Sequence, residues 1–194
     1  MSKYNFYVEG VSIEAVLNKL GGVGGAKRFL SDELRLVEAP KPEPPPEPVL
    51  DFIVRVDRSV KPKYPSWTEK VEHPELECSG PTEYDLQTEV EQWFHDDQKN
   101  MVVGNIIYKQ LQKDDALATC LNLQDGLSIA KKGIVVFRSL FGEKSLFLWR
   151  SVVQQKDDGH LFVPYICDTS GMVVVCWGWL GHEWGSFDPA LCFK

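Results

Sequence analysis

The cluster His95-Asp96-Asp97 combines the side chains of this chain that are best suited to catalysis. An imidazole beside two carboxylates can bind a divalent metal ion or act as a general base. The cluster therefore supports one functional hypothesis, a metal-assisted hydrolase or nuclease centred on His95, Asp96 and Asp97. Further metal ligands would have to come from other segments, such as His73 or Asp85.

Apolar residues before this cluster have helical spacing, which predicts a helix that begins near Asp85 and ends at His95. Its apolar side would be formed by Leu86, Val90, Trp93 and Phe94. Adjacent side chains on a helix point about 100° apart, so three consecutive residues do not easily converge on one ion. The alternative interpretation is a polar helix end in water, where a histidine interacts favourably with the helix dipole.

Tryptophans near the end of the sequence offer a second kind of site. Trp177, Trp179 and Trp184 lie within eight residues, and Trp177 and Trp179 share one face if the segment is a strand. This face either packs on helices as core or is presented to a partner. In the second interpretation, Trp184 and Phe187 extend the face, and Trp177, Trp179, Trp184 and Phe187 are the predicted partner-binding residues.

Two weaker groups complete the chemical candidates. His160, His182 and Glu183 contain metal-ligand side chains, but the fragment around Glu183 lacks the HExxH spacing of zinc proteases. Cys78 is expected to be the most exposed of the five cysteines, with no adjacent basic residue to activate it as a nucleophile. Serine-hydrolase, P-loop and Rossmann patterns are absent, and we expect no cofactor.

The elements that would position these residues are divided by a proline-rich segment. Residues 39–49 read APKPEPPPEPV and hold six of the twelve prolines. Proline fixes φ and removes a backbone donor, which predicts an extended polyproline II spacer. The chain then consists of a small helical hairpin module (1–38), the spacer (39–49) and an α+β domain (50–194). Because units below about 40 residues rarely fold alone, we expect the spacer to lie as a stiff strap on the domain and position the hairpin.

The first module is predicted to hold two short helices. Ser12 is a plausible N-cap for a helix that ends at Gly21, and a second helix covers residues 23–30. Short strands are predicted at residues 4–8, which are alternatively an aromatic lid, and at residues 34–37. The helices either dock on a larger body or begin a helix-turn-helix, although the second helix offers only Lys27 and Arg28 to DNA.

The second module is predicted to be α+β, with helices packed on a C-terminal antiparallel β-meander. Tight-turn sequences, KDDGH and DTSG, separate its last three long apolar segments. Pro164 inside the second of these implies an edge strand or a bulge. Strands are expected at 50–56, 146–154, 161–167, 172–179 and 191–193, and helices at 102–111, 117–121 and 125–140.

Composition limits the partners. Charged residues at 25% and hydrophobic residues at 43% are ordinary for a soluble globular protein, and the net charge of −7 disfavours nucleic acid and anionic membranes. No apolar run approaches the roughly 20 residues of a membrane span, and the start has no secretory signal. Five cysteines without a CxxC pair suit reduced thiols, so we expect a cytoplasmic location. The sequence indicates no oligomeric state.

Two parts of the chain resemble other proteins. The stretches DRSVKPKYPSW, HPELECSGPTEYDL, WFHDDQKN, GNIIY, KKGIVVFR, WRSVVQ and WGWLGHEWGSFDPALCF in residues 57–193 resemble a set of small uncharacterised bacterial proteins. Residues 13–37 resemble a short module that precedes differing regions in uncharacterised bacterial proteins. The resemblance implies modularity and a bacterial intracellular setting, and it carries no activity and no site residue.

Three functional hypotheses follow. The first is a non-enzymatic cytoplasmic interaction protein, adaptor or regulatory, with a protein partner. The second is the metal-assisted hydrolase or nuclease at His95. The third is a DNA-binding regulator that uses residues 12–31.

Overall fold

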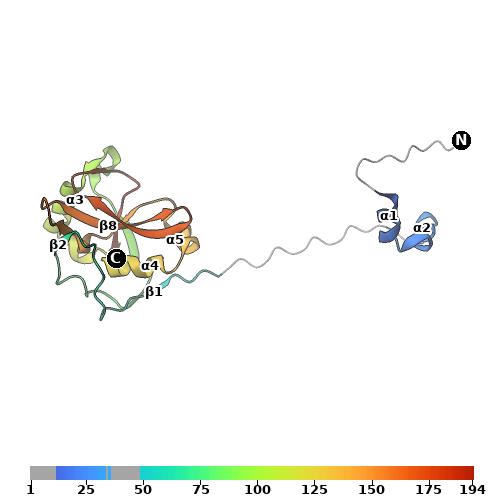
Figure 1. Cartoon of the computed structure of the whole chain (residues 1–194), viewed down its shortest axis with the longest axis horizontal. Helices are drawn as coiled ribbons and strands as arrows, with labels where there is room; N and C mark the ends of the chain where they lie inside the picture. The colour runs from blue at the N-terminus through green and yellow to red at the C-terminus, as the bar shows by residue number, and fades with distance from the viewer. Residues whose placement is uncertain (1–11, 34, 36–48) are drawn as a thin grey trace. The chain divides into compact units, whose positions relative to one another are not determined.

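The computed structural model describes residues 12–33, 35 and 49–194, which belong to two units, Met1–Glu47 and Pro48–Lys194. The segment predicted at residues 4–8 lies outside the described residues. So do the strand predicted at 34–37, apart from Arg35, and the proline spacer and its interpretation as a strap, apart from Val49. Figure 1 shows the helices and strands of the two units, coloured by residue number.

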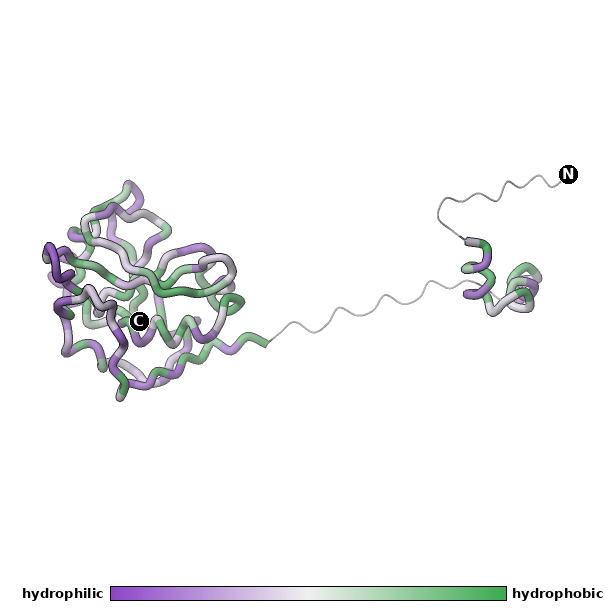
Figure 2. Tube along the Cα trace, viewed as in Figure 1, coloured by the Kyte–Doolittle hydropathy of each residue, from purple (hydrophilic) through white to green (hydrophobic). Residues whose placement is uncertain are grey.

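The first unit contains helices α1 (Ile13–Lys19) and α2 (Gly22–Leu30). Gly21 between them has a φ of +82°, a left-handed conformation that glycine adopts without a Cβ clash. Neither helix has a buried residue, and four of their apolar residues (Figure 2) are exposed: Ile13, Val16, Val23 and Leu30. Short helices gain most of their stability from packing, so this unit presents apolar side chains that a compact domain would bury.

The second unit is an α+β structure, as predicted. Its main sheet has seven strands in the order β2-β7-β8-β6-β11-β4, and β9 pairs with the other edge of β8. Two small antiparallel pairs, β1 with β3 and β5 with β10, stand beside it. The main strands are β2 (Thr68–Val71), β4 (Val90–Trp93), β6 (Leu146–Phe147), β7 (Val153–Gln155), β8 (Leu161–Thr169), β9 (Met172–Trp179) and β11 (Ala190–Phe193). The small pairs are β1 (Ile53–Arg55), β3 (Glu83–Asp85), β5 (Val102–Val103) and β10 (Glu183–Trp184).

The predicted strand 146–154 is interrupted. A short 3₁₀ helix, η3 (Trp149–Ser151), separates β6 from β7, and both pieces pair with β8. Pro164 of β8 lies opposite this interruption, where its carbonyl accepts a hydrogen bond from the Leu148 N–H at 3.0 Å. The proline is therefore accommodated at a break in the neighbouring strand, although β8 is not an edge strand.

Helices α4 (Leu123–Ala130) and α5 (Ile134–Phe141) pack on β8 and β9. The unit also contains α3 (Gly104–Lys113) and two further 3₁₀ helices, η1 (Asp96–Asn100) and η2 (Ala116–Thr119). The single helix predicted over 125–140 is wrong. Gly133, with a φ of +85°, breaks it into two. Among the described residues, no helix is long and apolar enough to cross a membrane.

The helix predicted from Asp85 to His95 is also wrong. Its residues form the end of β3, a turn, and β4, which pairs antiparallel with β11. The turn is stabilised locally because Asp85 accepts a hydrogen bond from the Gln87 N–H at 2.7 Å. Long-range pairing with β11 then overrides the helical spacing of the apolar residues.

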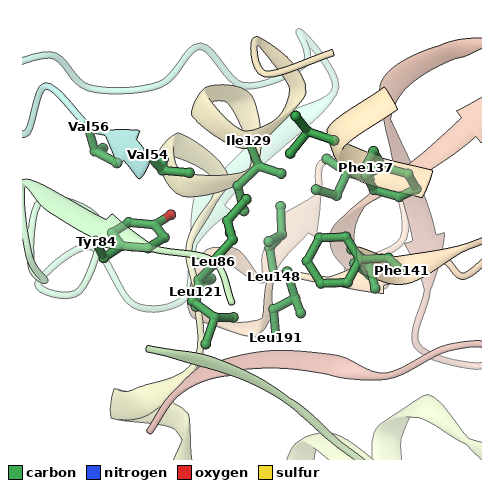
Figure 3. Packing of buried hydrophobic residues seen from close by; sticks show 14 residues of the cluster. Val54, Val56, Tyr84, Leu86, Leu121, Ile129, Phe137, Phe141, Leu148 and Leu191 are labelled. Carbon is green, nitrogen blue, oxygen red and sulfur yellow. The ribbon is translucent and has the colours of Figure 1, made fainter. Parts of the chain in front are cut away.

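Buried apolar residues form two clusters. The first lies where α4 and α5 meet the sheet and includes Leu148, Ile129 and Phe137 (Figure 3). The second surrounds Trp149, with Phe147, Trp184 and residues of α3. Residues of η3 and its flanks thus contribute to both clusters. Arg150, the middle residue of η3, is itself buried.

Candidate functional site

The structure places His95 at the start of a 3₁₀ helix, η1 (Asp96–Asn100), and not at the end of an α-helix. The His95 Nδ1 accepts a hydrogen bond from the Asp97 N–H at 3.1 Å, and the Gln98 side chain accepts one from the His95 N–H at 2.7 Å. His95 therefore acts as a helix cap, and one ring nitrogen is occupied by this role. Asp96 and Asp97 point into solvent.

The other ligands considered for that cluster have different partners. The His73 Nε2 lies 2.5 Å from the Tyr108 hydroxyl, and Asp85 is used in its turn. In the part of the chain that the structure describes, no group of three His, Cys, Asp or Glu side chains is placed to hold a metal ion. The geometry thus gives the hydrolase hypothesis no assembled centre.

The four predicted partner-binding residues do not share one surface. Trp177 and Trp179 lie on the same face of β9, where Trp177 packs edge-on against Trp67 at 5.5 Å between ring centroids. Trp184 is only 6% exposed and packs against Phe147 at 4.5 Å in the second cluster. Phe187 is 64% exposed in the loop after β10.

The remaining candidates from the sequence each have different surroundings and do not form one site. The His160 Nδ1 lies 2.5 Å from a carboxylate oxygen of Asp158, and the rings of His160 and His182 both contact Trp179. Cys78 is exposed, as predicted. On α2, Arg28 forms an exposed ion pair with Glu33 at 3.5 Å.

A buried ion pair that sequence reasoning missed lies at the N-terminus of α4. The Asp125 carboxylate is fully buried and accepts hydrogen bonds from Arg58 at 2.6 and 3.2 Å, from the Tyr84 hydroxyl at 3.1 Å and from the Asn122 N–H at 3.0 Å. Burial, and then the negative charge of Asp125, raise the pKa of the Tyr84 hydroxyl. Both charges of the pair are therefore compensated and hydrogen-bonded.

Arg150, the middle residue of η3, has a different environment. It is 3% exposed, and it donates from Nη1 to the Cys120 carbonyl at 3.1 Å and from Nη2 to the Ser79 hydroxyl. Its Nε has no partner, and no carboxylate of the described residues forms an ion pair with it. Burial lowers the pKa of Arg150; nearby Asp125 opposes this shift, although that carboxylate is bound by Arg58. Arg150 is thus a buried cation whose direct partners are neutral oxygens.

Arg150 lines an open pocket of about 660 Å³. Apolar walls come from Leu76, Ala118 and Phe193. The rest of the lining consists of Ser79, Thr88, Thr119, the charged residues Glu89 and Lys194, Gly80 and Pro81. We call this the Arg150 pocket.

Gly80, in the pocket wall, lies close to the guanidinium groups of Arg58 and Arg150. Its φ is +111°, and a Cβ at this position would lie 3.0 Å from the Arg58 Nη2 and 3.4 Å from the Arg150 Nη1. A Cβ would therefore be tight against Arg58 and in ordinary contact with Arg150, and the positive φ favours glycine at this position. The loop at Gly80 therefore contacts both Arg58, which is paired with Asp125, and Arg150, which has no carboxylate partner among the described residues.

Three stretches far apart in the sequence meet here. DRSVKPKYPSW supplies Arg58, HPELECSGPTEYDL supplies Ser79, Gly80 and Tyr84, and WRSVVQ supplies Arg150. One signal was present in the sequence: a charged residue inside the apolar run SLFLWRSVV is costly to bury without a purpose. No protein-family model, no curated protein and no solved structure matches the chain.

Proposed function

We propose that this protein is a non-enzymatic interaction protein that binds an anionic group of its partner in the Arg150 pocket. The observation that carries this proposal is the buried guanidinium of Arg150, which lines the pocket and lacks an ion-pair partner of its own among the described residues. A buried charge without a counter-ion is unfavourable, and a bound anion removes this cost.

The remaining features of the pocket suit binding. The Ser79 hydroxyl accepts a hydrogen bond from Arg150, and Thr119 adds a second neutral polar residue to the lining. Apolar walls lower the local polarity beside the cation, and this strengthens the attraction between charges. The volume lies within the range of small-molecule and peptide sites.

The proposal retains a cytoplasmic, adaptor or regulatory role, in which the partner is a protein. The hairpin of the first unit would then act as a second interaction module, joined to the domain by the proline spacer. Exposed apolar side chains on α1 and α2, such as Val23 at 65% and Leu30 at 83% exposure, support this role. The helices and β-meander of the second unit would serve as the rigid frame of the pocket.

Isothermal titration calorimetry with phenylacetate, phenylphosphate and neutral phenylacetamide tests the proposal. We expect at least one anion to bind and the amide not to bind. Ala118 is exposed on the pocket wall, so Ala118→Glu should weaken anion binding about fivefold, the effect of roughly 1 kcal/mol of charge repulsion near a surface.

Ala118→Gln is the matched control, because it adds nearly the same volume without charge. It should bind the anion within about twofold of the unmodified protein, since surface substitutions rarely exceed 0.5 kcal/mol. The proposal is wrong if neither anion binds, or if Ala118→Gln weakens binding as much as Ala118→Glu.

A further inference from the structure

The charges around the Arg150 pocket restrict the kind of anion that it accepts. We infer that the bound group is a carboxylate attached to an apolar body, and not a phosphate dianion. This inference rests on the proposed function and names the ligand class for the same pocket.

The first argument is the charge balance. Arg58 and Asp125 cancel each other, which leaves the single positive charge of Arg150. At the rim, the Lys194 Nζ donates to the Thr88 carbonyl at 2.9 Å, and Glu89 contributes an opposite charge. A monoanion neutralises the pocket, whereas a phosphate monoester at neutral pH carries about two negative charges and would repel Glu89.

The second argument is the number of free donors. A guanidinium has five N–H groups. One N–H of Nη1 and one of Nη2 are used by Cys120 and Ser79, and Nε is fully buried. One N–H therefore remains on each terminal nitrogen of Arg150. These two remaining donors can serve the two oxygens of a carboxylate, whereas a phosphate would leave its third oxygen without a guanidinium donor.

The third argument is the apolar wall. Leu76, Ala118 and Phe193 offer carbon surface beside the cation, and this surface favours a ligand with an aliphatic or aromatic part. Two sources have this chemistry: a free organic acid and the C-terminal carboxylate of a polypeptide with an apolar last residue.

The experiment compares the dissociation constants of phenylacetate and phenylphosphate for the full chain at neutral pH and constant ionic strength. We expect phenylacetate to bind at least about fivefold more tightly, as one surplus charge near Glu89 predicts. Glu89→Gln should then raise the affinity for phenylphosphate more than the affinity for phenylacetate, because repulsion scales with ligand charge. Glu69→Gln, an exposed change outside the pocket, is the control for net charge.

A second experiment, with a peptide, distinguishes a free organic acid from the C-terminal carboxylate of a polypeptide. The tripeptide acetyl-Ala-Ala-Phe is tested as the free acid and as the C-terminal amide. Tighter binding of the free acid than of phenylacetate assigns the carboxylate to a polypeptide end, and binding of phenylacetate alone assigns it to a small organic acid. Equal binding of the acid and the amide overturns the inference.

The failures of the two proposals are distinguishable. If phenylphosphate binds more tightly than phenylacetate, the ligand class is wrong and the anion pocket stands. If neither anion binds, both are wrong.

Discussion

Two arginines of the second unit that meet at one loop have different partners. Arg58 is 9% exposed at its side chain and holds the buried carboxylate of Asp125. Arg150 is 3% exposed and contacts only a carbonyl and a hydroxyl. Gly80 lies against both guanidinium groups. A carboxylate thus compensates Arg58, whereas Arg150 has no counter-ion among the described residues, which is the basis of the proposed anion site.

The largest expected effect on stability comes from breaking the Arg58–Asp125 ion pair. Arg58→Met leaves the Asp125 carboxylate buried without its cation, so we expect the free energy of unfolding to fall by about 3–5 kcal/mol. Urea unfolding followed by circular dichroism measures this change. Arg55→Met is the control, because the Arg55–Glu83 pair is exposed and should contribute less than about 1 kcal/mol. Equal losses in the two variants would contradict a structural role for Arg58.

The next effect concerns the loop that touches both arginines. Gly80→Ala combines a strained φ of +111° with a tight contact against the Arg58 Nη2, and should cost about 1–3 kcal/mol of stability. Gly171→Ala shares a positive φ, at +84°, but meets no neighbouring atom. Only the Gly80 variant should also weaken phenylacetate binding. Unchanged binding in a folded Gly80→Ala protein would show that the loop does not shape the pocket.

Arg150→Met should separate stability from binding. The variant loses two hydrogen bonds but also removes a buried uncompensated charge, so its stability should fall by only about 1–2 kcal/mol. Anion affinity should fall more than about tenfold, since hydrogen bonds to a charged group contribute roughly 1.5–3 kcal/mol. A stability loss as large as that of Arg58→Met, with anion binding retained, would reverse the roles of the two arginines.

The smallest effect is stabilisation by the ligand. Phenylacetate at ten times its dissociation constant should raise the stability of the unmodified protein by about 1.4 kcal/mol, measured by urea unfolding. Arg150→Met should show no increase at the same concentration. Equal stabilisation of both proteins would place the ligand elsewhere.

The sequence allowed part of this fold to be predicted, and the errors have physical causes. Strands β8 and β9 followed from β-branched and aromatic runs separated by a tight turn. The apolar residues Leu86, Val90 and Trp93 fit a helix equally well, and only pairing with the distant β11 makes them part of a strand and the turn before it. The break at Gly133 was hidden by an apolar stripe that continues on both sides.

The candidate site was harder to predict. His95 attracted attention because its carboxylate neighbours are adjacent in the sequence, yet its ring caps η1. Arg150 has no such neighbours in the sequence. Its hydrogen-bond partners, Ser79 and Cys120, are distant in the sequence and come close only in the folded chain. A charged residue in an apolar run indicates that its charge needs a counter-ion or a ligand. The run alone does not indicate which residues form the pocket around it.

The arginine side-chain Nε–H resonances in a ¹H–¹⁵N spectrum compare the two arginines directly in one sample. Titration with phenylacetate should shift the Arg150 resonance progressively and leave the Arg58 resonance in place, because Asp125 already binds Arg58. Substitution of each arginine in turn assigns the two signals. If the Arg150 resonance does not move, or the Arg58 resonance moves equally, then Arg150 is not an anion receptor.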